Sequence, residues 1–417
     1  MAGHPAQARV AETGPSDEVI GLEAIMRMAY AGQDLNGLYQ QLIARTNADP
    51  ADAAAILDMS VILQVSGHRD EGLRLQGVAL QMQRSFRRVY GDGRGPKVVA
   101  LMTAGDFMAN TPIEFLLAGS NATLHLVYVN AETADLAHLP PHEVLFTAVG
   151  ESPQNQPVLA RCAELLAGWR GPILAGDPQR IARLTRDGVA ALLAEESVVV
   201  APATARIGRA ELARLARGDI APDALLPGAA FPLIARPIGT HAGQGMEKLD
   251  TPAALAAYLA GRVETEFYLA PYVDYANPDG RFRKQRIAFI GGRAYPSHMA
   301  VSDHWMVHYL SAGMTEDAGR RAEEAAWMEG FDADFAVRHA EAFAALHRRI
   351  GLDYFGIDCA ELADGRLLLF EADVAMIVHD LDPEDLFPYK KPAMHRLFAA
   401  FQAELAKVAQ AGADQAA

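Results

Sequence analysis

Long hydrophobic runs are absent from this chain of 417 residues, and cysteine is nearly absent. No stretch reaches the roughly 18 apolar residues that a membrane-spanning helix needs, so we expect no membrane span. The two cysteines, Cys162 and Cys359, lie far apart, which excludes a disulfide framework and a cysteine zinc site. The first residues, Met-Ala-Gly-His-Pro-Ala-Gln-Ala-Arg, lack the apolar core of a signal peptide. We therefore expect a cytoplasmic protein whose two thiols are buried and reduced.

Positive charge is also scarce, because 37 Lys and Arg stand against 52 Asp and Glu, for a formal net charge of -15. Nucleic acids are bound largely through Lys and Arg on phosphates, so no nucleic-acid partner is expected. Hydrophobic residues make up 51% of the chain and charged residues 21%, which is ordinary globular composition. At the usual ~150 residues per domain, the length predicts two or three domains.

Residues 17–90 carry apolar residues at the three- and four-residue spacing of helices, interrupted by short polar breakers. After a loose polar tail over 1–16, the pattern predicts about four antiparallel helices in a domain spanning 1–94. Asn-Ala-Asp-Pro at 47–50, followed by an Ala-rich helix, is similar to a tetratricopeptide pair. One pair is no repeat array, so a helical packing domain is favoured. Residues 91–96 indicate a linker, which predicts that this domain folds independently.

The pattern changes after the linker. Apolar runs that predict strands alternate with helical segments, which implies a parallel sheet covered on both faces in a small open α/β domain over 95–178. The expected strands are 97–102, 122–129, 143–149 and 173–174, and the expected helices are 111–117 and 157–169. The remainder, 179–410, predicts an antiparallel α+β architecture with a hairpin at Gly291-Gly292. Its expected strands are 231–236, 266–273, 282–290, 293–300 and 366–371.

A glycine-rich loop follows the first strand of this last part. The strand ends in Arg236, and the loop contains Gly239, Gly243 and Gly245. Glycines let backbone N–H groups approach an anion, and a cation at a strand end can hold a phosphate. The loop lacks the Gly-Lys-Ser/Thr of a Walker motif and the spacing of a dinucleotide fingerprint. It indicates either a phosphate-binding loop or a flexible hairpin tip.

Three carboxylates are spaced to meet on two neighbouring strands. Glu371 and Asp373 share one face of a strand, and a turn at Asp364-Gly365 folds the Asp358 segment alongside. Such a cluster repels itself unless cations neutralise it, and Mg²⁺ held by carboxylates and nucleotide phosphates is the usual solution. Because apolar residues flank Glu371, we favour a magnesium site over solvated strand-end charges.

Two further segments carry candidate binding residues. Four cations in six residues begin a strand at Arg281, and alternation places Lys284 and Arg286 on one face of it. A basic strand facing the carboxylates is sensible if ATP and Mg²⁺ lie between them, and an exposed cationic edge is the alternative. A zinc site is disfavoured in the second segment because a third ligand is missing. We expect its side chains to line a substrate pocket or to form a core polar network: His298, His304, Trp305, His308 and Tyr309.

Taken in chain order, these features resemble the ATP-grasp superfamily over about residues 97–400. Residues 177–187 resemble its N-P…R-D-K helix, 201–204 its P-x-T, and 231–245 its P-V-V-x-K-P-x-x-G-x-x-G-x-G-V. The spacing of Asp358, Glu371 and Asp373 resembles the D…E-x-N magnesium motif of D-alanine–D-alanine ligases and RimK-like ligases. The resemblance, which includes glutathione synthase-like carboxylate–amine ligases, implies an ATP-grasp fold: a pre-ATP-grasp α/β domain and two α+β lobes, preceded here by the helical domain.

The resemblance also implies residue roles. Gly243 and Gly245 would close over the phosphates of ATP, where Arg236 replaces the usual Lys. Arg286 would contact the transferring phosphoryl group, which makes Arg236 and Arg286 the candidate catalytic residues. The implied metal ligands are Asp358, Glu371 and Asp373. The implied adenosine-binding residues are Tyr268, Leu269 and Ala270, through their backbone, and Asp274 at the ribose.

Some positions depart from the family pattern. Gly188 stands where the Lys of N-P…R-D-K would be, so Arg183 or Arg186 would have to substitute. Asp373 replaces the usual Asn and adds a negative charge. The N-P-x-P-G that usually follows is replaced by residues 375–379, whose His379 joins the candidate substrate residues. These changes bear on the substrate more than on the fold.

The sequence therefore predicts an ATP- and Mg²⁺-dependent ligase that joins a carboxylate to an amine or thiol through an acyl phosphate, with release of ADP and phosphate. Two alternatives stay open: a phosphotransferase that stops at phosphorylation, and a nucleotide-binding regulatory protein whose helices bind a partner. The expected partners are small-molecule or peptide carboxylate and amine substrates. A homodimer and a protein partner for the N-terminal helices are left open.

Overall fold

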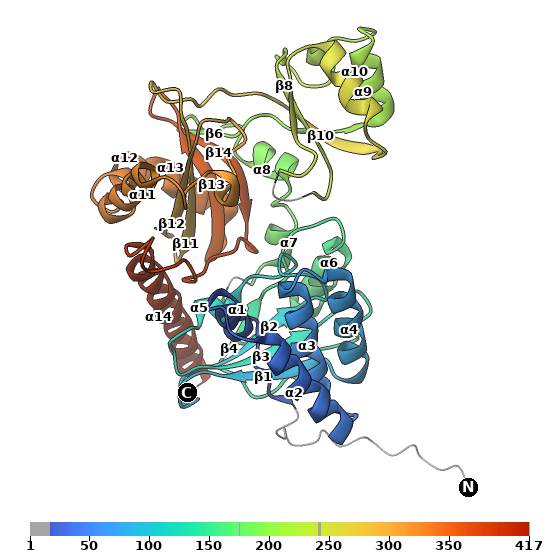
Figure 1. The fold of residues 1–417 in the computed structure, drawn as a ribbon, viewed down its shortest axis with the longest axis vertical. Helices are drawn as coiled ribbons and strands as arrows, with labels where there is room; N and C mark the ends of the chain where they lie inside the picture. The colour runs from blue at the N-terminus through green and yellow to red at the C-terminus, as the bar shows by residue number, and fades with distance from the viewer. Residues whose placement is uncertain (1–16, 175, 241–242, 417) are drawn as a thin grey trace. The chain divides into compact units, whose positions relative to one another are not determined.

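The computed structural model describes residues 17–174, 176–240 and 243–416. The chain forms two compact units (Figure 1): unit 1 holds Met1–Val149, Ala160–Gly176 and Gln402–Ala417, and unit 2 holds Gly150–Leu159 and Asp177–Phe401. No helix in the described part of the chain is long and apolar enough to cross a membrane. The expected fold class, with α/β and α+β parts after N-terminal helices, is confirmed.

Unit 1 begins with the four helices that the sequence predicts. They are α1 (Leu22–Tyr30), α2 (Leu35–Ala48), α3 (Ala53–Val65) and α4 (Arg69–Met82). Asp52 caps α3 by accepting the N–H of Ala55 at 2.8 Å, and α3 packs against the other three helices. Its first residues are small enough to be buried completely at this crossing.

The segment after α4 is a strand, β1 (Ser85–Val89), where the sequence pattern predicted helix. It pairs antiparallel with β3 (Thr123–Tyr128), with Phe86 opposite Leu126. Phe86 is fully buried while its neighbours are partly exposed, which is the alternation of a strand packed on one face. The prediction was wrong here because pairing with a distant strand overrides a five-residue local pattern.

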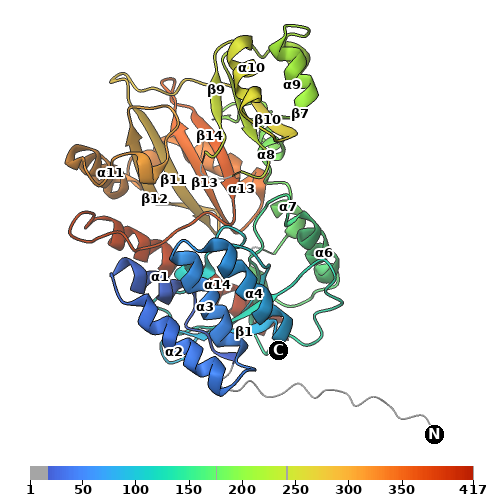
Figure 2. The ribbon, with the colours of Figure 1, turned by 45° about the vertical axis from the view of Figure 1, so that its right-hand side comes forward.

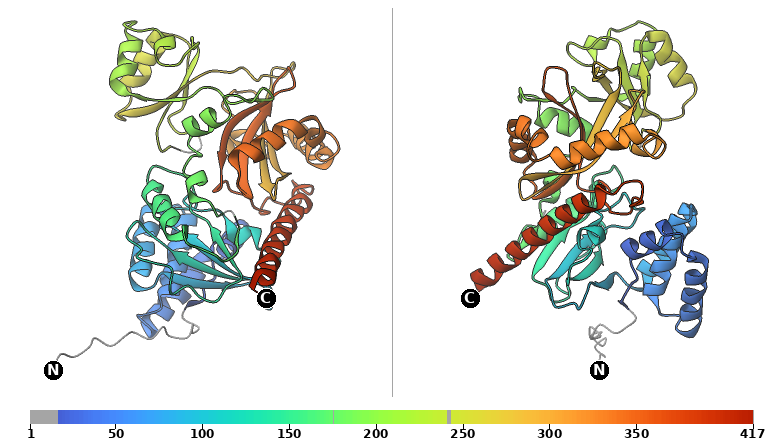
Figure 3. Two further views of the ribbon diagram at one scale, coloured as in Figure 1. Left: turned by 180° about the vertical axis from the view of Figure 1, so that it is seen from behind. Right: turned by 60° about the vertical axis from the view of Figure 1, so that its left-hand side comes forward.

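The sheet of unit 1 has the order β1-β3-β2-β4-β5. Besides β3, its parallel strands are β2 (Lys97–Met102), β4 (Val144–Thr147) and β5 (Ile173–Leu174). Short α5 (Ile113–Leu116) connects β2 to β3, and α6 (Gln156–Leu166) connects β4 to β5. Figure 3 shows this sheet, in cyan and teal, from two further sides. The chain steps from β2 to one neighbour, β3, and then crosses to the other neighbour, β4. Strand order therefore reverses at β2, the arrangement in which open α/β sheets bind ligands at strand carboxyl ends.

Unit 2 contains two sheets (Figure 2). The first is antiparallel throughout, and the second is antiparallel except at one edge, where its last two strands pair in parallel. The first has the order β7-β10-β8-β9 and packs its buried face, with Phe267 and Leu233, against α9 and α10. The elements of this part are α7 (Pro178–Ile181), α8 (Arg186–Leu192), β6 (Val199–Val200), β7 (Ala205–Gly208), α9 (Arg209–Ala216), β8 (Leu233–Pro237), β9 (Glu247–Leu249), α10 (Pro252–Ala260) and β10 (Glu266–Pro271).

The second sheet has the order β12-β11-β13-β14-β6. The predicted Gly291-Gly292 hairpin joins β11 to β12, and both glycines have the positive φ that such a turn requires, 55° and 84°. The remaining elements are β11 (Phe282–Ile290), β12 (Arg293–Ser302), α11 (Ala318–Gly330), α12 (Phe335–Arg338), α13 (Ala340–Ile350), β13 (Tyr354–Glu361), β14 (Leu367–Asp373) and α14 (Lys390–Ala416).

Candidate functional site

Charged residues lie in matching register at the centre of the second sheet of unit 2. Arg286 of β11 lies opposite Asp358 of β13, which lies opposite Glu371 of β14. Asp358 is fully buried and accepts from Arg286 at both oxygens, at 2.8 and 3.0 Å. Lys284 Nζ lies 2.7 Å from the Asp358 carboxylate, so Lys284 and Arg286 share one face of β11 as alternation predicts. Burial raises the pKa of Asp358, but the two cations outweigh it and hold that pKa well below its usual range.

The second carboxylate of the group is held from α8. Arg186 donates to the Glu371 carboxylate and, at 3.3 Å, to the carbonyl of Phe370. Burial raises the pKa of Glu371, and Arg186 reverses this, so the net direction is downward. Glu371 is therefore an ion whose present partner is a single arginine.

Gly188, near the start of α8, leaves no room for a side chain. Thr185 caps α8 by accepting the N–H of Gly188 at 3.0 Å, which brings the helix start close to the chain before it. A Cβ at Gly188 would meet the carbonyl oxygen of Arg183 at 2.3 Å, so no side chain fits there without movement. Of the two candidate substitutes, Arg186 reaches the carboxylates, whereas Arg183 is exposed between α7 and α8.

Asp373 differs from the other two carboxylates. It accepts the N–H of Ala375 at 3.0 Å, and burial raises its pKa to about 7, with a smaller contribution from the charge of Glu371. Near neutral pH this carboxyl is therefore partly protonated. Among the described residues, no group of three or more His, Cys, Asp or Glu side chains is arranged to hold a metal ion. Asp358 and Glu371 contact cations instead.

Arg236 belongs to the first sheet of unit 2. It lies at the end of β8, opposite Tyr268 of β10, and is only 6% exposed. Its guanidinium donates to the carbonyl of Thr240, while its buried Nε has no hydrogen-bond partner in the described part of the chain. Burial, and then the like charge of Arg186, lower the pKa of Arg236 to about 10. A buried cation with an unused donor near a second cation is suited to an anion.

The glycine loop after β8 is described only at its two ends, because residues 241–242 lie outside the described residues. Gly239, Gly243 and Gly245 have φ of 78°, 73° and 69°, which side-chain-bearing residues rarely adopt. A Cβ at Gly245 would lie 2.9 Å from Pro237 Cδ. Arg236 could instead have formed a surface ion pair with Glu247 of β9. Glu247 accepts from Arg262 at 2.8 Å, and Arg236 donates to Thr240.

The residues expected to bind adenosine lie on β10, an inner strand of the first sheet, and on the chain after it. Leu269 pairs with both β7 and β8, while Ala270 pairs with β8 alone, so the ladder with β7 ends just before Ala270. Tyr268 stacks under Arg206, whose guanidinium lies 5.3 Å from the ring centre. Asp274 accepts the N–H of Ala276 at 3.1 Å and the hydroxyl of Tyr272 at 3.4 Å.

The histidine-rich segment is divided between two places. His298 lies opposite Arg286 on β12, its ring is 4.5 Å from that of Tyr309, and its buried Nδ1 has no partner among the described residues. Burial and then Arg286 hold the pKa of His298 well below its usual range. His308 has its pKa lowered by burial and then by Lys284, which places it near the same group.

The other members of that segment lie apart from the charged group. His304 is exposed and accepts the N–H of Met306 at 3.1 Å, so the zinc interpretation has no support. Trp305 packs edge-on against Tyr272, with ring centres 5.8 Å apart. His379 follows β14, and burial lowers its pKa despite the nearby charge of Asp382.

Sequence reasoning missed Lys390 and Glu324. Lys390 is 3% exposed, lies 3.3 Å from Asp382 and 3.5 Å from Glu324, and contacts the hydroxyl of Tyr309. Glu324 is fully buried and also accepts from Tyr309 at 3.1 Å. Lys390-Lys391 looks in the sequence like an ordinary exposed pair, and only the fold shows that Lys390 is inside. Lys284 was detectable, because alternation places it on the face of Arg286.

No protein-family model and no curated protein sequence matches the chain. Solved structures do match. A RimK domain ATP-grasp protein from Sphaerobacter thermophilus DSM 20745 is 14% identical, with a TM-score of 0.41, over 74% of this chain and 98% of that one. The VanG D-Ala:D-Ser ligase from Enterococcus faecalis is 11% identical, with a TM-score of 0.45, over 76% of this chain and 100% of that one. The D-alanine-D-alanine ligase from Coxiella burnetii is 11% identical, with a TM-score of 0.38, over 66% of this chain and 72% of that one.

Proposed function

We propose that unit 2 binds ATP and ligates a carboxylate to an amine through an acyl phosphate, in the manner of ATP-grasp ligases. The observation that carries the proposal is a surplus of cations around the three carboxylates. Asp358 and Glu371 are ionised and Asp373 is partly protonated, while the cations near them are Arg186, Arg236, Lys284 and Arg286. Such a group has a net positive charge before any ligand arrives, which favours a polyanion such as the triphosphate of ATP.

Each cation has a different capacity in this reaction. Arg236 has an unused Nε next to the glycine loop and would hold a phosphate oxygen. Arg286 is fixed by its two bonds to Asp358, so it would offer a preorganised positive charge to the phosphoryl group in transfer. Lys284 is a flexible point charge that can leave Asp358 for a phosphate. Phosphoryl transfer requires little more than positioning and charge neutralisation, which these residues supply.

Magnesium fits the carboxylates by donor chemistry. Carboxylate oxygens are hard donors of the kind Mg²⁺ prefers, and it is usually bound by one or two of them together with substrate phosphates. Glu371 and Asp373 would hold the ion, and the partly protonated Asp373 would ionise beside it. When bound, Mg²⁺ would neutralise phosphate charge in the transfer. Arg186 would then be released from Glu371 toward the nucleotide.

His298 is suited to the second half of the reaction, in which the amine attacks. The attacking amine must be neutral and correctly oriented, and its proton can leave with the released phosphate. Burial and Arg286 keep His298 neutral, and its Nδ1 is unpartnered among the described residues. We therefore assign His298 as a hydrogen-bond acceptor that orients the amine.

The test is ADP formation by the purified full chain with ATP, Mg²⁺ and a panel of acid and amine pairs. We expect at least one pair to release ADP and phosphate, with turnover lost in Arg286→Ala. Arg283→Ala is the matched control, because Arg283 lies on the other face of β11, bonded to Asp279 and Glu323. ADP release that needs the acid but not the amine would indicate a phosphotransferase. ATP binding without turnover for every pair would indicate a regulatory protein, and absence of ATP binding would refute the proposal.

A further inference from the structure

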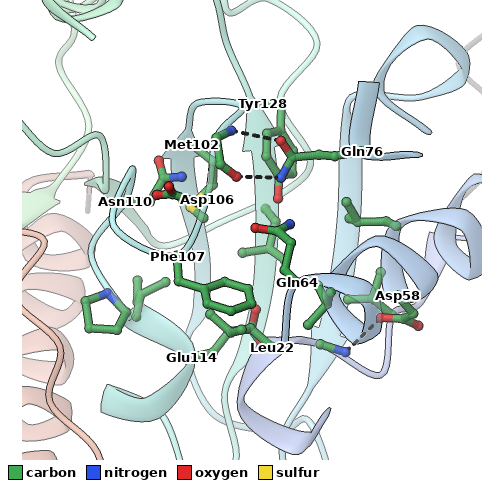
Figure 4. A pocket seen from close by; sticks show the side chains of 18 of the residues that line it. Leu22, Asp58, Gln64, Gln76, Met102, Asp106, Phe107, Asn110, Glu114 and Tyr128 are labelled. Atoms are coloured by element: carbon green, nitrogen blue, oxygen red, sulfur yellow. Dashed lines mark hydrogen bonds between the residues drawn. The ribbon is translucent and has the colours of Figure 1, made fainter. Parts of the chain in front are cut away.

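Unit 1 contains a cavity that the proposed reaction does not use. Its volume is about 60 Å³, and it lies where α1, α3 and α4 meet the last residues of β2 and β3, Met102 and Tyr128 (Figure 4). These are the carboxyl ends of neighbouring parallel strands, the edge at which open α/β sheets bind small molecules. One water needs roughly 10–15 Å³ of such space, so the cavity has room for a ligand of about four to six non-hydrogen atoms.

Two polar side chains that line the cavity lack protein partners. Thr111 is 2% exposed, and its hydroxyl has no hydrogen bond among the described residues. The buried Oε1 of Gln64 is also without a partner there, and Figure 4 shows the side chain projecting from α3 toward the middle of the cavity. Buried polar atoms are nearly always paired, so two unpaired oxygens on one cavity indicate a missing hydrogen-bond donor.

Two buried carboxylates line the same cavity. Asp58 accepts the N–H groups of Ile20 at 2.8 Å and Gly21 at 3.0 Å, and Glu114 accepts that of Glu23 at 3.2 Å. These bonds hold the start of α1, but a carboxylate has about four acceptor sites, so capacity remains.

Two other polar side chains of the lining are already satisfied. Gln76 bonds both the N–H and the carbonyl of Gly105, at 2.8 and 3.0 Å. Asn110 does the same with Thr103, at 2.8 Å each. Acceptor capacity toward the cavity therefore remains at the carboxylates of Asp58 and Glu114 and at the Oε1 of Gln64.

We propose that this cavity binds a small organic cation with a primary ammonium group. The ammonium would donate to Thr111, Gln64 and Glu114, and its short carbon chain would pack against Leu22 and Phe107, which also line the cavity. The proposal is independent of nucleotide binding, because every residue that it uses belongs to unit 1.

The ionisation of the two carboxylates supplies a pH signature. Burial raises the pKa of Glu114 to about 7 and that of Asp58 to about 6. A bound ammonium favours the ionised carboxylates, so the complex should be tighter at pH 8 than at pH 5.5, with protons released on binding below pH 7. The other charged or titratable groups around this pair and the cavity are Glu23, Arg45, Arg88, Tyr90, Asp106 and Tyr128.

The experiment is calorimetric titration of the full chain at pH 8, without nucleotide, using n-propylamine and ethanolamine as probes. Propan-1-ol, propionate and Mg²⁺ are the comparison ligands. We expect saturable binding of the amines alone, and at least tenfold weaker binding in Thr111→Val with an undiminished melting temperature, because the lost hydroxyl has no protein partner. Thr147→Val is the matched control: Thr147 is fully buried in unit 1, its hydroxyl is equally unpartnered among the described residues, and it lies outside the cavity. Glu114→Gln should also weaken amine binding and remove most of its pH dependence.

Three outcomes would overturn this assignment. The first is no amine binding at pH 8. The second is equal binding of propan-1-ol or propionate, which would remove the role of positive charge. The third is the same loss of affinity in Thr111→Val and Thr147→Val, which would show that a general change in unit 1 is responsible.

Discussion

The backbone at Gly188 determines which residue of α8 supplies the positive charge beside Glu371. A Cβ at position 188 would overlap the carbonyl of Arg183, so α8 begins without a side chain there. Arg186, two residues earlier, instead reaches Glu371. Glu371 thus has its positive partner at position 186, where a side chain has room.

Arg236→Ala should weaken ATP binding by roughly 2–4 kcal/mol, the range for truncating one partner of a desolvated charge pair. Arg236→Lys should recover much of this loss, because a lysine there would still place a positive charge beside the phosphates. Nucleotide titration by calorimetry measures both changes. Arg217→Ala is the control, because Arg217 pairs with Asp219 on the surface. Its removal should change the free energy of ATP binding by less than about 1 kcal/mol. An unchanged dissociation constant in Arg236→Ala would remove Arg236 and the glycine loop from the ATP site.

Glu371→Gln should abolish ATP turnover while the fold survives. The amide keeps the size of the side chain but not the charge that Arg186 and Mg²⁺ require. Steady-state ADP formation and a thermal melt measure the two effects separately. Glu361→Gln is the comparison variant, since Glu361 lies on the neighbouring strand and bonds Arg338 at 2.8 Å. Normal turnover in Glu371→Gln would refute the proposed metal ligand.

Glu114→Gln should stabilise the protein more at pH 8 than at pH 5. The folded pKa of Glu114, about 7, lies above its ordinary 4.5, so the folded state binds the proton more tightly than the unfolded state. The resulting stabilisation is complete below about 4.5 and is lost as pH rises to about 7. A glutamine removes this loss, which is of the order of 1–3 kcal/mol at pH 8. Chemical unfolding of both proteins at the two pH values tests this, and an equal change at both would contradict it.

At the scale of elements, β1 joins the N-terminal helices to the sheet. Five residues of β1 pair with β3. Side chains of α4 also bond the loop after β2: Arg69 bonds Asp106 at 2.7 Å, and Gln76 donates to the carbonyl of Gly105 at 3.0 Å. The linker at 91–96 is therefore a turn between two strands of one sheet. Independent folding of the helices, expected from the sequence, is not what these contacts favour.

A chain starting at Gly95 should be less stable than one starting at Asp17, and more prone to aggregate. It loses β1, which leaves β3 as an exposed, apolar sheet edge. Thermal melts and light scattering at equal concentration compare the two chains. Equal melting temperatures would show that the helices and β1 are a separable addition after all.

The strands and the charged face were predictable because their signals are local. Strands 97–102 and 282–290 match β2 and β11 residue for residue, since apolar runs between breakers define them. The alternation of side chains along a strand was enough to predict that Lys284 and Arg286 lie on the same face. By contrast, β1 and Lys390 depend on contacts with distant segments, and the pairing of Asp358 with Arg286 needs the strand register. The cavity of unit 1 could not be predicted, because its lining comes from six helices and strands and two loop segments.

At the scale of the whole molecule, the two proposals assign different ligands to different units. Arg236, Arg286 and Glu371 belong to unit 2, and Thr111 and Glu114 belong to unit 1. A ligand that binds the folded state slows local opening of the backbone it contacts, which amide hydrogen exchange records segment by segment. At a hundred times its dissociation constant, such a ligand adds about 2.7 kcal/mol to the stability of what it binds.

ATP with Mg²⁺ should therefore slow exchange at residues 233–249 and 354–373, whereas n-propylamine should slow it at 20–23 and 102–114. The physical reason is that each ligand restrains only the segments whose polar groups it occupies. Mass spectrometry of peptides from the full chain measures this, with the Arg236→Ala and Thr111→Val variants as controls. Each variant should lose one pattern and keep the other. Protection by ATP in the unit 1 segments alone would place the nucleotide outside the charged group of unit 2. Protection by n-propylamine in the unit 2 segments alone would show that the amine does not bind in the cavity of unit 1.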